Sequence, residues 1–97
     1  MDKITDEKLD KYFDVTGRAL EKVKIVSPDK THLNNSAKDF LDMANRYYSD
    51  AKHFRENNDY VNAFAALNYA HGWLDAGARS GLFEVKDSRL FTVDGDE

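Results

Sequence analysis

The chain of 97 residues contains no cysteine and only one proline. The absence of cysteine excludes a disulfide framework and thiolate metal sites, and it fits a reducing compartment. No apolar run approaches the roughly 20 residues that a membrane-spanning helix needs. The charged start of the chain also has no apolar segment of the signal-peptide type. We therefore expect a cytoplasmic protein with no membrane partner.

The sequence also lacks a basic excess, since 18 acidic residues against 14 Lys and Arg give a formal net charge of −4. A negative domain without a long basic stripe lacks the usual electrostatic footprint of a nucleic-acid-binding protein. With 41% apolar and 33% charged residues, the composition is typical of a folded helical domain with one core. We predict a single domain over residues 1–97 and expect no nucleic-acid partner.

The sequence does contain three amphipathic segments separated by residues that end helices. Thr5 is suited to cap the first helix, and Pro28 ends it because the residue before a proline is pushed out of helical conformation. Asn57 and Asn58 tolerate the left-handed conformation of a helix end, and Asp59 can cap the helix that follows. The predicted helices cover residues 5–26, 30–57 and 59–80.

The second segment has the strongest helical period. Small and large apolar residues alternate along one face at spacings of four and three, which is typical of a helix packed against other helices. They are Leu33, Ala37, Phe40, Ala44, Tyr47, Ala51 and Phe54. The third segment is apolar over more than half of its circumference, as expected for a helix that contacts two others. The sequence therefore predicts an all-α, three-helix antiparallel up-down-up bundle, with a helical hairpin at 40–81 and an irregular C-terminal tail over 82–97.

Three glycines carry specific expectations. Gly17 lies inside the first helix, where glycine costs up to about 1 kcal/mol against alanine, so it either permits a close contact or marks a bend. Gly77 follows Ala63 and Ala70 at intervals of seven, which should let a neighbouring helix approach closely. Gly81 is the expected left-handed residue at the end of the third helix.

Several short motifs between Tyr48 and Leu82 together resemble the small archaeal family catalogued as domain of unknown function 357. They are Asp50-Ala51, Asp59-Tyr60-Val61, Ala63-Phe64-Ala65, Tyr69-Ala70, Gly72-Trp73-Leu74-Asp75-Ala76-Gly77 and Gly81-Leu82. The resemblance is close over residues 40–82 and implies a compact three-helix bundle. It implies no activity, because none is established for the family.

The helical hairpin is also similar to two broader classes. It looks like one tetratricopeptide helix pair, but solenoids need about three repeats to bury their faces and only one copy is present. HEPN domains are nucleotide-associated helical modules whose ribonuclease members use an arginine and a histidine four to six residues apart. Arg46 and His53 enclose six residues, but they lie on the second helix and not on a later one. A HEPN-like nucleotide- or RNA-associated module is therefore kept only as an alternative.

No set of residues predicts an enzyme or a cofactor, since the chain has neither a nucleophile elbow nor a glycine-rich phosphate loop. His71 and Asp75 lie one helical turn apart and could hold a divalent metal ion if a third donor joined them, which is the second alternative. The competing interpretation is that Asp75 or Asn68 satisfies a polar nitrogen of His71.

Tyr69 and Trp73 are the most informative pair. They lie one turn apart on the third helix, on a side that should point away from the predicted core residues Tyr60, Leu67 and Leu74. Water alone favours lysine or glutamate at such positions, whereas aromatic residues are enriched at interface centres. The sequence therefore predicts a protein-interaction or self-association module. Its aromatic pair would be covered by another protein, by a second copy in a homodimer, or by the tail of the same chain.

Overall fold

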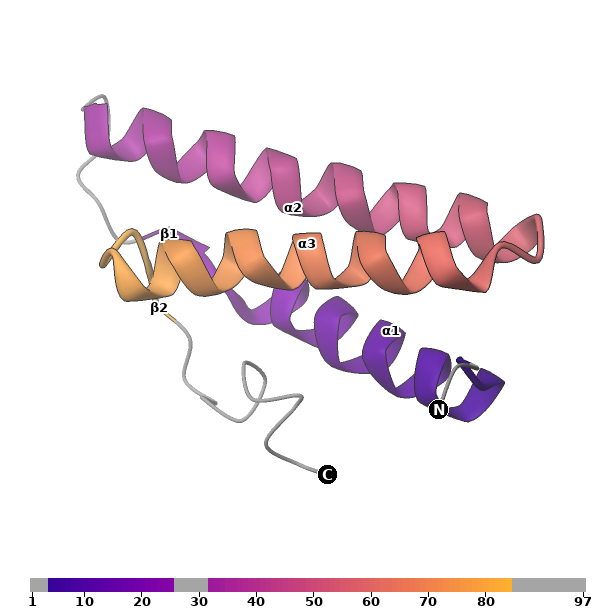
Figure 1. Cartoon of the computed structure of the whole chain (residues 1–97). Coiled ribbons are helices and arrows are strands. Elements are labelled where there is room, and N and C mark those ends of the chain that lie inside the picture. The colour runs from indigo at the N-terminus through magenta and orange to yellow at the C-terminus, as the bar shows by residue number, and fades with distance from the viewer. Residues whose placement is uncertain (1–3, 26–31, 85–97) are drawn as a thin grey trace.

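The computed structural model describes residues 4–25 and 32–84. Within these residues the element order is α1 (Asp6–Lys22), β1 (Lys24–Ile25), α2 (His32–Glu56), α3 (Tyr60–Arg79) and β2 (Phe83–Glu84). Helices α1 and α3 run in one direction and α2 runs in the other (Figure 1). The predicted all-α antiparallel up-down-up bundle is confirmed.

The turn between α2 and α3 has the chemistry that the sequence indicated. Asn58 adopts a left-handed φ of 61°, which asparagine tolerates better than most residues with a Cβ. The carboxylate of Asp59 caps α3 by accepting a hydrogen bond from the backbone N–H of Asn62 at 3.3 Å. The two helices therefore pack side by side as an antiparallel hairpin (Figure 1).

Helix α1 begins as predicted but ends earlier. The hydroxyl of Thr5 accepts a hydrogen bond from the backbone N–H of Lys8 at 3.1 Å, which caps the helix. The predicted end at residue 26 is wrong, because Lys24 pairs with Glu84 and Ile25 with Phe83 in an antiparallel two-stranded ladder. The predicted irregular tail therefore starts with strand β2. Pro28 and residues 85–97 lie outside the described residues.

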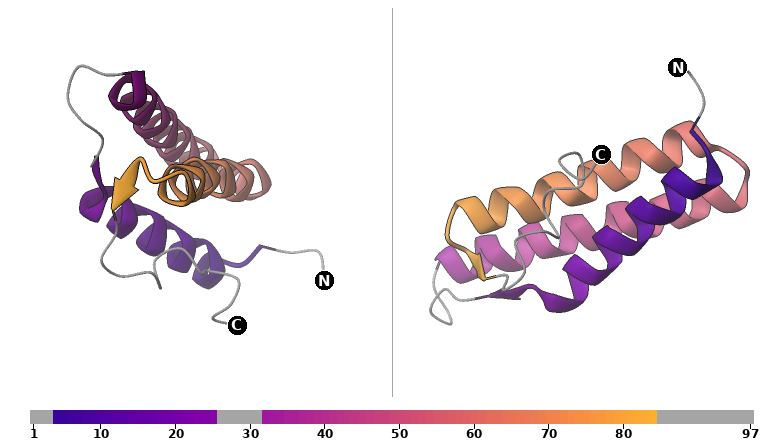
Figure 2. Two further views of the ribbon diagram at one scale, coloured as in Figure 1. Left: turned by 90° about the vertical axis from the view of Figure 1, so that its left-hand side faces the viewer. Right: turned by 90° about the horizontal axis from the view of Figure 1, so that it is seen from below.

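Two groups of buried side chains form the core, and α3 contributes to both. The group nearer the hairpin turn contains Leu9, Tyr12, Ala51, Ala63, Ala66 and Leu67. The group nearer the strands contains Ala19, Ala37, Ala44, Leu74, Leu82 and Phe83. Helix α3 lies between α1 and α2 when the bundle is seen from its end (Figure 2). This position accounts for the broad apolar circumference of α3.

The predicted apolar face of α2 holds except at its first member. Ala37, Ala44 and Ala51 are buried, whereas Leu33 is 58% exposed. The ring of Phe40 on α2 faces Trp73 on α3. Leu33 therefore lies outside the buried face of α2, although its neighbour Asn34 is only 6% exposed.

The glycines at positions 17 and 77 have different neighbours. A Cβ on Gly17 would lie 2.6 Å from the hydroxyl oxygen of Tyr48, so Gly17 permits a close contact. A Cβ on Gly77 would overlap the ring of Phe83. The expectation of a closely packed neighbouring helix at Gly77 is therefore wrong, because a side chain of β2 occupies the space. Gly81 has the expected left-handed φ of 77°.

Candidate interaction surface

Four aromatic side chains of α2 and α3 form two ring pairs across the hairpin. The rings of Tyr47 and Tyr69 stack with their centroids 5.2 Å apart and their planes at 27°. The rings of Phe40 and Trp73 meet edge to face at 5.0 Å and 70°. We call these four residues the aromatic ladder. Tyr69 is 61% exposed, and the other three are half-buried.

The ladder changes the predicted orientation of the two residues on α3. Trp73 does not point fully away from the core, because it packs against the group of buried residues near the strands and against Phe40. Tyr69 does present most of its surface to solvent. The partners Phe40 and Tyr47 were missed because their spacing on α2 marked them as core residues. The size of their side chains could have identified them, because a large side chain at the edge of a helix face reaches a neighbouring helix.

The solvent-facing side of α3 is almost free of charge. From Tyr60 to Leu74 the helix contains no Asp, Glu, Lys or Arg. Its exposed residues in that stretch are Val61, Asn62, Asn68, Tyr69 and Gly72. By contrast, every exposed residue of α1 between Asp6 and Lys22 is charged. Depletion of charge together with exposed aromatic surface is the composition of the centre of a protein interface.

In the second predicted pair, His71 and Asp75, the carboxylate of Asp75 has a partner further along α3. His71 is half-buried, and the carboxylate of Asp75 accepts a hydrogen bond from Arg79 at 2.8 Å. Among the residues that the structure describes, no three His, Cys, Asp or Glu side chains are close enough to hold a metal ion. Asp75 is therefore already engaged, and the metal alternative gains no third ligand from this part of the chain.

Arg46 and His53 likewise have separate partners. Arg46 forms an ion pair with Asp42 at 2.8 Å, and 72% of its side chain is exposed. His53 is exposed near the end of α2, where a ring nitrogen lies 3.3 Å from the amide nitrogen of Asn57. These contacts are those of a solvated helix face.

A polar cluster ties α1 to the turn of the hairpin. Arg55 contacts Asp10 at 2.5 Å and Asp6 at 3.7 Å, and the hydroxyl of Tyr60 donates a hydrogen bond to Asp6. The hydrogen bond to Asp10 raises the pKa of Arg55, and the hydrogen bond to Asp6 raises the pKa of Tyr60. The guanidinium also lies over the ring of Phe13, 5.4 Å from its centroid. We call Arg55, Asp6, Asp10 and Tyr60 the polar clasp.

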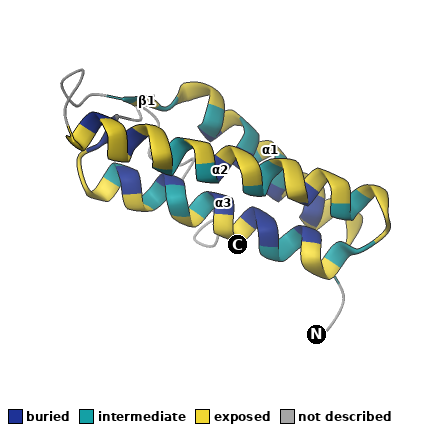
Figure 3. Cartoon of the chain, turned by 90° about the horizontal axis from the view of Figure 1, so that it is seen from above, coloured by how far each residue is buried: buried dark blue, intermediate teal, exposed yellow. Residues whose placement is uncertain are grey.

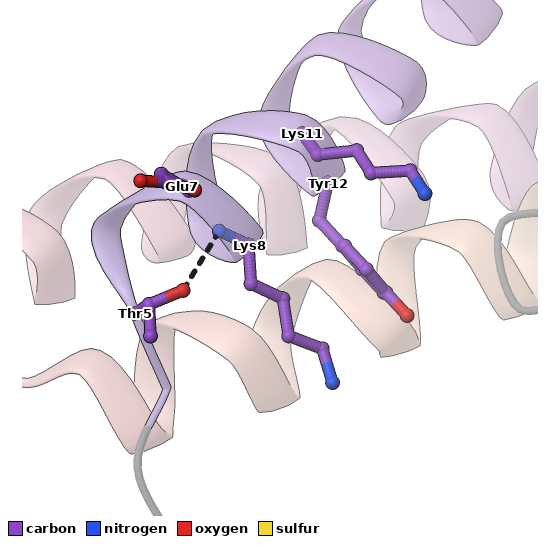
Figure 4. Close-up of a pocket in the computed structure, with 5 residues that line it drawn as sticks. All are labelled: Thr5, Glu7, Lys8, Lys11 and Tyr12. Atoms are coloured by element: carbon purple, nitrogen blue, oxygen red, sulfur yellow. Dashed lines mark hydrogen bonds between the residues drawn. The ribbon is translucent and has the colours of Figure 1, made fainter. Parts of the chain in front are cut away.

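Two open depressions lie beside α1. The larger, of about 520 Å³, is lined by Thr5, Glu7, Lys8, Lys11 and Tyr12. Lys8 and Tyr12 extend to the same side of α1, whereas Glu7 points the other way (Figure 4). The smaller, of about 240 Å³, is lined by Phe13, Lys52, Arg55 and Glu56. Both have charges of either sign and no converging set of polar groups, so neither has the composition of a small-molecule site.

These features define a small three-helix bundle whose third helix presents an uncharged, partly aromatic face. The family model described as a protein of unknown function (DUF357) matches residues 11–83. Because the match covers most of the chain, the protein belongs to this family, as its motifs indicated. No curated protein and no solved structure matches the chain. Among the described helices, none combines the length and the apolar character needed to cross a membrane.

Proposed function

We propose that the protein acts by association with another protein chain, through the uncharged face of α3 and the aromatic ladder. The observation that carries this proposal is the exposure of Tyr69, at 61%, in the middle of a helix face without charged residues. Val61 on the same helix is 65% exposed. Contact of these apolar side chains with water is unfavourable, and burial against a second surface would remove their apolar area from water.

The ladder also restricts Tyr69 before any partner binds. Its ring already stacks on Tyr47, so less side-chain freedom remains to be lost on association. Tyrosine combines a large contact area with few rotatable bonds, which makes it an effective interface anchor. Truncation of such an anchor typically weakens binding by about 2 kcal/mol or more.

The proposal is tested with a photoreactive phenylalanine analogue placed at position 69 of the full chain. The labelled protein is irradiated in fresh extract of its source organism, and the adducts are identified by mass spectrometry. The matched control carries the analogue at Lys11, an exposed position on the charged side of α1. We expect a defined adduct with a protein chain from position 69 only.

Competition makes the result specific. An excess of unlabelled parent protein should suppress the adduct. An excess of Tyr69→Lys should not, because this variant lacks the exposed tyrosine side chain that would contact the partner. Equal adducts from positions 69 and 11 would overturn the proposal. So would an adduct confined to residues 85–97 of the same molecule, since the tail would then cover the surface without any partner.

A further inference from the structure

We infer that residues 85–97 of the same chain dock on the surface where the first turns of α1 face α3. Their apolar side chains lie against Phe64, and their carboxylates lie beside Lys8 and Lys11. The segment thereby occupies the depression of about 520 Å³ beside α1. This surface is separate from the aromatic ladder, so the inference does not depend on the proposed function.

The depression beside α1 combines positive charge with aromatic rings. The ammonium group of Lys8 lies 5.3 Å from the centroid of the Phe64 ring and 6.0 Å from that of the Tyr12 ring. Lys11 is exposed on the same wall, whereas Glu7 points to the other side of α1 (Figure 4). Among the described residues, neither lysine forms an ion pair. Such a surface favours a segment that brings both carboxylates and apolar side chains.

The residues that follow β2 have the complementary composition. Leu90, Phe91 and Val93 are apolar, and residues 94–97 include three carboxylates and no basic side chain. Opposite charges on two surfaces favour their association, and apolar side chains gain free energy when they leave water. The segment therefore carries the two kinds of group that the depression can bind.

The segment also starts beside this surface. Strand β2 pairs with β1, and β1 directly follows α1 in the chain. The ring of Phe83 occupies the space next to Gly77 on α3. The chain therefore leaves Glu84 where the ends of α1 and α3 meet, and Figure 2 shows β2 between these two helices.

The length of the segment matches the distance to be spanned. From Gly77 back to Phe64 there are thirteen residues of α3, which is about 20 Å at the rise of an α-helix. The seven residues from Glu84 to Phe91 span up to about 23 Å when extended. Phe91 can therefore reach Phe64, and the carboxylates that follow it can reach the two lysines.

The aromatic ladder lies on another side of α3. At about 100° per residue, Tyr69 and Trp73 are roughly 140–180° around the helix from Phe64. Their rings meet those of α2 there. Figure 3, in which α2 is nearest the viewer, shows exposed residues along the outer side of this helix. A segment that starts beside α1 would have to cross the exposed surface of α3 to reach the ladder, so docking on α1 leaves the ladder open.

A nitroxide spin label tests where the segment lies, and the absence of native cysteine makes the attachment site unique. The label is placed on Gly95→Cys in the full chain, which keeps all three carboxylates of residues 94–97. We expect the amide signals of Lys8 and Phe64 to be broadened at least twofold more than that of Trp73. In a mixture of spin-labelled chains and unlabelled, isotope-enriched chains, the enriched chains should show no broadening, because docking occurs within one molecule.

Charge exchange tests the cause of the contact. Lys8→Glu with Lys11→Glu should reduce the broadening at Phe64 at least twofold, because like charges then face each other. Asp94→Lys with Asp96→Lys in the same chain should restore it. Both lysines are exposed, so the variants should stay folded, which circular dichroism checks.

The matched control is Arg18→Glu with Lys52→Glu. It makes the same change in net charge at two exposed positions that do not line the depression, and it should leave the broadening at Phe64 unchanged. An equal loss in the control would overturn the assigned contact, because net charge alone would then be its cause.

The position of the broadening separates this inference from the proposed function. Absent or evenly spread broadening would overturn the docked segment and leave the proposed function untouched. Broadening centred on Tyr69 and Trp73 would overturn both, because the segment would then cover the ladder. Broadening of the enriched chains in the mixed sample would overturn docking within one molecule, because the segment would then belong to another copy.

Discussion

At the scale of the residue, two glycines of α3 have opposite surroundings. A Cβ on Gly72 would have no neighbouring atom within 4 Å, whereas a Cβ on Gly77 would overlap the ring of Phe83. A helix with glycine at an interior position is less stable than one with alanine there, unless the methyl group of alanine would overlap neighbouring atoms. The same substitution should therefore change the free energy of unfolding in opposite directions at the two positions.

We expect Gly72→Ala to raise the free energy of unfolding by up to about 1 kcal/mol. Gly77→Ala should lower it by about 1–3 kcal/mol, because the added methyl group displaces a buried ring. The measurement is urea unfolding followed by circular dichroism, at protein concentrations where the chain is monomeric. In a Phe83→Ala background the penalty of Gly77→Ala should largely disappear. An equal penalty in both backgrounds would show that Phe83 is not its cause.

Tyr48 makes the free energy of unfolding depend on pH in the alkaline range. Its hydroxyl donates a hydrogen bond to the backbone oxygen of Phe13 at 3.2 Å. Burial raises the pKa of Tyr48 above its ordinary value near 10, and the negative charges of Asp14 and Glu21 add to this effect. The unfolded chain therefore releases this proton at a lower pH than the folded chain. The corresponding stability is fully present below about pH 10 and is lost as the pH rises through the raised pKa.

We expect the free energy of unfolding of the parent protein to fall between pH 9 and pH 11, in urea titrations at constant ionic strength. Tyr48→Phe should lower stability at pH 8 by about 1 kcal/mol, through loss of the hydrogen bond to Phe13. The free energy of unfolding of Tyr48→Phe should fall less steeply between pH 9 and pH 11 than that of the parent protein. Tyr60 also has a raised pKa, so Tyr48→Phe with Tyr60→Phe should flatten the profile further. Parallel profiles for parent and Tyr48→Phe would contradict the assignment.

At the scale of the element, α1 is held to the hairpin by one polar and one apolar set of contacts. The polar clasp joins Arg55, at the end of α2, to Asp6 and Asp10 in the first turns of α1. The apolar set includes the ring pair of Tyr12 and Phe64. The side chain of Arg55 is 29% exposed, but those of Asp6 and Asp10 are 67% and 63% exposed, so solvent screens the charges and packing of the guanidinium on Phe13 adds to the contact.

We expect Arg55→Ala to lower the free energy of unfolding by about 1–3 kcal/mol, through loss of charged hydrogen bonds and of packing on Phe13. Arg18→Ala is the matched control, because its pair with Asp14 is well exposed on one helix, and it should cost at most about 0.5 kcal/mol. Both are measured by urea unfolding at low and high salt. If the two variants have equal effects, the clasp contributes no more than a surface ion pair.

At the scale of the whole molecule, α3 joins the two groups of buried residues into one core. Leu67 belongs to the group near the turn and Leu74 to the group near the strands. Their side chains are 1% and 0% exposed. Because one helix carries both groups, loss of packing in one removes support from the other, which favours a single cooperative unfolding transition.

We expect Leu67→Ala to lower the free energy of unfolding by about 2–5 kcal/mol, because it leaves a cavity beneath α1 and α2. Val61→Ala, at a position 65% exposed, should change it by at most about 0.5 kcal/mol. Trp73 fluorescence reports on the group near the strands, and circular dichroism reports on all three helices. Their urea transitions should coincide in both variants. A separate early transition in Leu67→Ala would show that the two groups unfold independently.

Local chemistry in the sequence determined the helices and their connection. Thr5 caps α1, Asn58 adopts the left-handed conformation of the turn, and Asp59 caps α3. Each of these devices acts through atoms within a few residues along the chain, so residue type and spacing were enough to predict it. Reasoning from residue type and spacing also identified two residues of the candidate interaction surface, Tyr69 and Trp73.

Only the tertiary structure decided which segments meet across long sequence separations. The end of α1, the occupant of the space at Gly77 and the polar clasp all depend on contacts between distant residues. The pairing of Tyr69 with Tyr47 belongs to the same group, because α2 and α3 settle their relative alignment only when they pack. Helical periodicity specifies which side of a helix is apolar. It does not specify which residue of another element will lie against that side, since that choice is made by packing of the whole chain.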